Sequence, residues 1–85
     1  MTVFMVQLAR TRQQLGAIVR RHRRQRGWSQ NELAVRAGTR QATISQIEAG
    51  QDVRYSTLSD VLAALELELA VQPRSSGEPD LGSIF

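Results

Sequence analysis

Hydrophobic residues recur at helical spacing in four consecutive stretches of this chain. The spacing predicts helices over about residues 12–26, 30–36 and 40–49, and a fourth that begins near Ser56 or Thr57. Each of the first and fourth helices carries one apolar stripe, as expected of a helix packed against a core. The stripe of the first helix is Leu15, Ile18, Val19 and His22, and that of the fourth is Leu58, Val61, Leu62 and Leu65.

Polar residues and glycines predict where these helices begin and end. Thr11 with Gln14, and Ser29 with Glu32, have the three-residue spacing of a capping box, in which each side chain satisfies a free backbone N–H group. Thr39 is expected to cap the third helix. Gly27 and Gly50 follow the first and third helices, where a glycine can take the left-handed conformation that ends a helix.

After the fourth helix the period changes from helical to alternating. Leu65, Leu67, Leu69 and Val71 alternate with polar or small residues, which predicts a β-strand over residues 67–72. A lone strand leaves its backbone groups unpaired, so it needs a partner. The partner is either residues 1–10, an arm or short strand, or a second copy of the protein, which we favour because it also makes a dimer. Dimerisation would then involve Leu67, Leu69 and Val71.

Residues 73–85 are rich in Pro, Gly, Ser and acidic residues, and we expect a disordered tail. The tail nevertheless carries three apolar residues that have nothing within it to pack against: Leu81, Ile84 and Phe85. The domain organisation is therefore an arm (1–10), a helical domain (11–66), a dimerisation strand (67–72) and a tail (73–85).

Composition and charge narrow the class of protein. The 85 residues contain no Cys, which together with the lack of a signal-peptide pattern favours a cytoplasmic protein. Residues 1–56 carry a net charge of +7 and residues 57–85 a net charge of −4. A basic body favours nucleic-acid binding, although a solvated basic face is the alternative. With one His, no Gly-rich phosphate loop and no paired acids, we expect no enzyme, no metal and no cofactor.

The spacing between residues 30 and 47 meets the steric requirements of a helix-turn-helix. Counting Gln30 as the first position, Ala34 at the fifth allows close helix crossing and Gly38 at the ninth makes the sharp turn. Ile44 and Ile47, at the fifteenth and eighteenth positions, point inward. The four matches together predict an all-α fold built around this motif.

The outer face of the third helix has the chemistry of a surface that reads DNA. With its isoleucines inward, it presents hydrogen-bonding groups and alanines but no carboxylate, and it therefore suits the major groove. The predicted base-reading residues are Arg40, Gln41, Ala42, Thr43, Ser45 and Gln46. The predicted phosphate contacts are Gln30 at a helix start, Arg54 in a loop, and Arg23 within the basic run "RRHRRQR". We interpret His22 and Trp28 as packed side chains.

The order "LGAIVRRHRRQRGWSQNELAVRAGTRQATISQIEAG" resembles the Xre/Cro-type helix-turn-helix family, and "ALELELAV" is similar to the HipB-like antitoxin subgroup. The resemblance covers about residues 15–72. It implies a lambda-repressor-like bundle of four helices and a C-terminal β-strand that pairs in a dimer. It further implies an autorepressor that binds an inverted-repeat operator and neutralises a HipA-like kinase toxin. The resemblance assigns DNA recognition to residues 40–43, phosphate binding to Gln30 and toxin binding to Ile84 and Phe85.

Two other interpretations remain open. The chain could be a stand-alone repressor or the antitoxin of an unrelated toxin, in which case deleting residues 73–85 should leave every activity intact. It could also be a protein-interaction module without DNA binding, in which case replacing Arg40 and Gln41 by Ala should not change affinity for DNA at any salt concentration.

Overall fold

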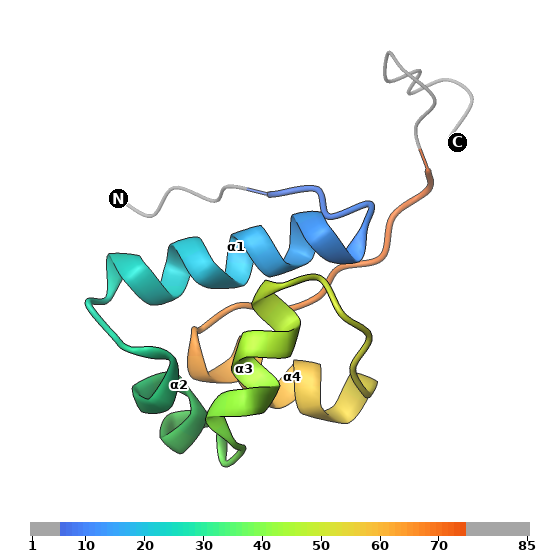
Figure 1. Ribbon diagram of the computed structural model, residues 1–85. Helices are drawn as coiled ribbons and strands as arrows, with labels where there is room; N and C mark the ends of the chain where they lie inside the picture. The colour runs from blue at the N-terminus through green and yellow to red at the C-terminus, as the bar shows by residue number, and fades with distance from the viewer. Residues whose placement is uncertain (1–5, 75–85) are drawn as a thin grey trace, which may run out of the picture.

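The computed structural model describes residues 6–74. It contains four helices in that range: α1 (Arg12–Gln25), α2 (Gln30–Ala37), α3 (Gln41–Glu48) and α4 (Tyr55–Ala64). Helix α3 packs against α1 and α2, and α2 packs against α4 (Figure 1). The described residues therefore form an all-α bundle with α2 and α3 joined by a short turn, as the spacing predicted.

Both predicted capping boxes are confirmed. The Thr11 side chain accepts a hydrogen bond from the Gln14 backbone and the Ser29 side chain accepts one from the Glu32 backbone, with the reciprocal bonds also present. Gly38 lies in the left-handed conformation at φ 70° and ends α2. These local contacts fix where α1 and α2 begin and where the turn to α3 is made.

The predicted starts of the other two helices are wrong. Helix α3 begins after Arg40 and α4 begins after Arg54, and neither residue makes a side-chain capping bond. The backbone N–H of Thr39 donates instead to the Ala34 carbonyl at 2.9 Å, because Thr39 still belongs to the turn that closes α2. In these two helices packing sets the boundaries, without help from a capping side chain.

The core lies where the four helices meet. Five of its side chains are fully buried, and they come from all four helices or the residue that follows α4: Val19, Leu33, Ile44, Val61 and Leu65. The steric positions of the motif are confirmed, since Ala34 is 1% exposed and Ile47 is 3% exposed.

The buried face of α1 differs from the apolar stripe predicted for it. Its buried residues are Gly16, Val19 and Arg23, while Leu15, Ile18 and His22 are only half-buried. A Cβ on Gly16 would meet the carbonyl oxygens of Ile47 and Glu48. The backbones of α1 and α3 therefore approach each other closely at this glycine.

The segment after α4 is extended, and residues 67–74 form no strand within this chain. Leu67 packs against the core, whereas Leu69 is 47% exposed and Val71 is fully exposed. The strand predicted over 67–72 thus lacks a partner in the described part of a single chain. The arm is described only from residue 6, and the apolar tail residues Leu81, Ile84 and Phe85 lie outside the described residues.

Within residues 6–74, no helix has the length and apolar character needed to cross a membrane.

Candidate nucleic-acid interface

The outer face of α3 is polar, exposed and free of carboxylates. Ile44 and Ile47 point into the core, and Thr43 is half-buried. The exposed residues on and around this face are Arg40, Gln41, Ala42, Ser45, Gln46 and Ala49. Of the six residues predicted to read bases, five therefore lie on α3 and the sixth, Arg40, directly precedes it. Their contacts with DNA bases stay predictions.

The one acidic residue of α3 is turned inward and neutralised. The Glu48 side chain is 5% exposed and forms a bidentate ion pair with Arg23, whose Nε and Nη2 donate at 2.7 and 3.0 Å. Arg23 Nη1 also donates to the Trp28 carbonyl at 2.7 Å. Glu48 raises the pKa of Arg23 through its side-chain hydrogen bonds. A buried pair thus joins α1 to α3 and leaves no negative charge on the outer face.

The surroundings of Arg23 correct the prediction that it contacts a DNA phosphate. The residue is 8% exposed, and three of its N–H groups donate to other parts of the protein. The side chain is therefore enclosed between helices and does not project toward solvent. Sequence reasoning missed this role because the apolar stripe of α1 gave no reason to place a cation inside.

Gln30 lies at the start of α2, as predicted, but its side chain is already engaged. Its Nε2 donates to Glu48 Oε1 at 3.3 Å, and the residue is half-buried. One further N–H and the amide oxygen remain for another contact. Arg54 is exposed immediately before α4. Phosphate binding by these two residues stays a prediction.

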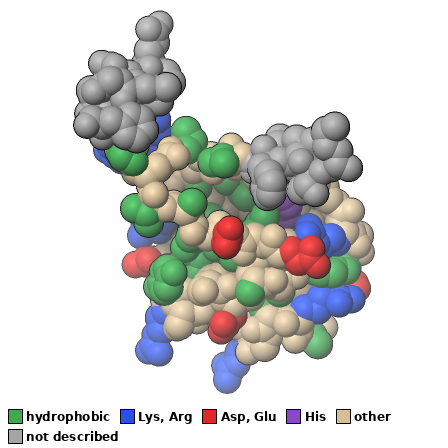
Figure 2. All heavy atoms as spheres, turned by 180° about the vertical axis from the view of Figure 1, so that it is seen from behind, with side chains coloured by type: hydrophobic (Ala, Val, Ile, Leu, Met, Phe, Trp, Pro, Cys, Tyr) green, Lys and Arg blue, Asp and Glu red, His purple; other side chains and the backbone are tan. Residues whose placement is uncertain are grey.

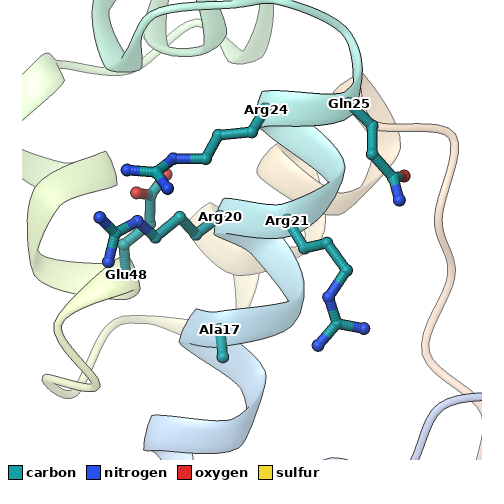
Figure 3. A pocket seen from close by; sticks show the side chains of 6 residues that line it. All are labelled: Ala17, Arg20, Arg21, Arg24, Gln25 and Glu48. Carbon is teal, nitrogen blue, oxygen red and sulfur yellow. The ribbon is translucent and has the colours of Figure 1, made fainter.

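A groove runs between α1 and the C-terminal half of α3. It is lined by three arginines of α1, by Gln30 of α2, and by residues in or directly after the second half of α3: Arg20, Arg23, Arg24, Gln30, Ser45, Glu48 and Ala49. Figure 3 shows a neighbouring hollow on the same side of α1, in which Arg20 and Arg24 extend toward Glu48 of α3, whereas Arg21 points away from Glu48. The groove therefore joins the basic helix directly to the face predicted to read DNA.

His22 and Trp28 are packed side chains, as predicted. His22 Nε2 lies 3.1 Å from Gln7 Oε1, and burial together with the charges of Arg26 and Arg21 lowers its pKa. Trp28 packs against the core, and the Arg36 guanidinium lies 4.1 Å from the centre of its ring. Neither side chain lies in the groove beside α3.

The opposite side of the molecule has a different character. Figure 2 shows that face, where hydrophobic and acidic side chains are interspersed and the arginines lie mainly toward the edges. This face therefore carries acidic groups, which repel a polyanion, whereas the outer face of α3 presents no carboxylate.

Fold and surface together define a helix-turn-helix protein of the DNA-binding class. The chain matches the Helix-turn-helix family over residues 19–72. It is 35% identical over 68 residues to antitoxin HipB of Escherichia coli strain K12, covering 79% of this chain and 77% of that protein. The chain therefore belongs to the HipB-like helix-turn-helix family.

Solved structures show the same similarity. A chain of a HipA-HipB-O2-O3 complex superimposes with a TM-score of 0.74 at 32% identity, covering 82% of this chain and 100% of that one. A chain of a HipB-O4 20mer complex gives a TM-score of 0.75 at 32% identity, with the same coverage. The HTH-type transcriptional regulator SlrR of Bacillus subtilis strain 168 is 40% identical over 57 residues, which are 65% of this chain and 38% of that protein.

Proposed function

We propose that this protein is a dimeric DNA-binding autorepressor and the antitoxin of a HipA-like kinase toxin. The observation that carries the proposal is the outer face of α3, which is exposed, rich in hydrogen-bonding groups and free of carboxylates. Membership of the HipB-like family supports the antitoxin role.

DNA recognition rests on the residues at the start and along the outside of α3. Arg40 can reach a guanine, Gln41 or Gln46 an adenine, and Ala42 a thymine methyl group. The narrow alanine-centred surface allows the helix to approach the base edges. Backbone phosphates at the edges of the major groove are contacted by Gln30 and Arg54.

Dimerisation rests on the extended segment after α4. Its exposed apolar residues Leu69 and Val71 and its unpaired backbone suit pairing with the same segment of a second copy. Such a dimer presents two α3 helices to major grooves about one helical turn apart, roughly 34 Å, and requires an inverted-repeat operator.

DNA binding is tested by selecting duplexes from a randomised pool and footprinting the protein on them. The expected result is a protected inverted repeat whose half-sites are about 10 base pairs apart, centre to centre. The matched control is Arg40→Ala with Gln41→Ala, which should lose the selected site while keeping weak non-specific binding. A single unrepeated half-site would contradict the dimer, and no enrichment would contradict DNA binding.

Toxin binding is tested by capturing the full-length chain and a chain lacking residues 81–85 from the native host. We expect a kinase-sized partner that full-length protein retains and the truncation weakens, because Leu81, Ile84 and Phe85 are the proposed docking residues. The similarity to a HipA-HipB complex supports this test.

The second candidate function is a stand-alone repressor, and the similarity to SlrR, an HTH-type transcriptional regulator, supports a regulatory role. That similarity covers a smaller part of the chain than the similarity to HipB. Recovery of the chain with DNA and no kinase would make this second function the better account.

A further inference from the structure

The arginines of the basic run on α1 point to different sides of the helix. At about 100° per residue, Arg20 and Arg24 lie about 40° apart on one shoulder of α1, beside its buried face. Arg21 lies opposite the buried face, away from α3, and Arg23 lies inside it. The position of each arginine around the helix therefore separates those that face the groove from those that do not.

Arg20 and Arg24 keep their positive charge available in the groove. Within residues 6–74, neither forms an ion pair or a side-chain hydrogen bond. The nearby carboxylate of Glu48 does not compete, because its two oxygens accept from Arg23 and Gln30. Two unpaired cations thus lie next to an acid that is already neutralised.

The groove lies beside α3, the helix proposed to read DNA bases, where a DNA backbone has to pass. The major groove is about 12 Å wide, close to the diameter of a helix with its side chains, so phosphates flank any helix that enters it. Ser45 and Ala49 of the outer α3 face line this groove together with the two arginines. A DNA strand that runs beside α3 therefore contacts Arg20 and Arg24.

We infer that Arg20 and Arg24 form a clamp on the DNA backbone, which binds one or two adjacent phosphates along the flank of α3. The inference rests on the proposed DNA binding and identifies which arginines of α1 carry its electrostatic part. It also replaces Arg23, whose charge is used inside the protein, as the phosphate contact on this helix.

The test measures affinity for a duplex enriched by wild-type protein, at salt concentrations between about 50 and 200 mM. Each lost phosphate contact lowers the slope of log affinity against log salt by about 0.9, equivalent to about eightfold weaker binding near 0.1 M salt. We expect this loss for Arg20→Ala and for Arg24→Ala, and about 60-fold weaker binding for the double variant.

Arg21→Ala is the matched control, because it removes the same charge from the same helix at a position that does not line the groove beside Ser45 and Ala49. We expect it to change the slope by less than about half a unit, since screening weakens charges that do not touch DNA. Replacing Arg20 and Arg24 by Lys keeps both charges and should restore most of the slope, which a loss of folding would not allow.

Four results would overturn the clamp. A double variant that keeps the wild-type slope, or an Arg21→Ala variant that loses as much as Arg20→Ala, would show that the groove makes no local contact. Unchanged DNA binding with loss of an acidic protein partner would assign the groove to that partner. Failure of wild-type protein to enrich any duplex would instead refute the proposed function, and the clamp with it.

Discussion

Replacing Glu48 by Gln isolates the contribution of the buried ion pair. The substitution keeps the size of the side chain but removes its charge. The Arg23 side chain, which is only 10% exposed, then has no counter-ion. Glu48 accepts three hydrogen bonds, two from Arg23 and one from Gln30. A glutamine has one acceptor oxygen, and its amide nitrogen would face a donor of the guanidinium.

The magnitude follows from these contacts. A hydrogen bond to a charged group contributes about 1.5–3 kcal/mol, and removing one partner of a buried ion pair costs about 3–5 kcal/mol. Because the glutamine oxygen keeps one bond, we expect Glu48→Gln to lower the free energy of unfolding by about 3 kcal/mol. In a domain of this size that corresponds to a fall in Tm of roughly 12–24 °C.

The assay is urea unfolding of wild type, Glu48→Gln, Arg23→Met and the double variant. The second single variant leaves the Glu48 carboxylate without its cation, so it should also be destabilising. The double variant has neither buried charge, and we expect its loss to be smaller than the sum of the single losses by at least about 2 kcal/mol. Additive losses, or a loss below about 0.5 kcal/mol for Glu48→Gln, would refute the reasoning.

Three further predictions concern packing, pH and assembly. Gly16→Ala should lower the free energy of unfolding by about 1–3 kcal/mol, because its Cβ would press on the Ile47 carbonyl. Thermal unfolding of this variant, compared with wild type and with Ala17→Gly as the control at the neighbouring position, checks the prediction. The pKa of His22 is lowered in the folded state, so the unfolded state binds the proton first as the pH falls. The free energy of unfolding should therefore fall as the pH drops below about 6.5. Urea unfolding from about pH 7.5 to 5 should show a smaller fall for His22→Gln than for wild type. Val71→Asp should leave the fold intact, because the side chain is exposed, but convert a dimer to a monomer in analytical ultracentrifugation; an unchanged dimer would move the interface elsewhere.

Local sequence signals predicted the parts of the fold that local contacts determine. The capping boxes at Thr11 and Ser29 and the turn at Gly38 involve residues close in the chain, so their spacing was sufficient. The buried positions of the helix-turn-helix, Ala34, Ile44 and Ile47, could likewise be predicted from their spacing. The exposed face of α3 followed directly from the inward direction of Ile44 and Ile47.

Contacts between distant residues were not visible in the same way. Arg23 is buried because Glu48, 25 residues later, neutralises it, and hydrophobic periodicity cannot reveal such a pair. The starts of α3 and α4 were missed for a related reason: tertiary packing places them after Arg40 and Arg54 without a capping side chain. The direction of each arginine on α1 likewise required the position of α3.

The position of Trp28 gives the protein a built-in optical reporter. It is the only tryptophan in the chain, and its ring lies between the guanidinium groups of Arg36 and Arg26, at 4.1 and 5.7 Å from the ring centre. Its backbone carbonyl accepts the hydrogen bond from Arg23. Its intrinsic fluorescence therefore monitors the junction of α1 and α2 without any label, and it follows unfolding at a place separate from the outer face of α3.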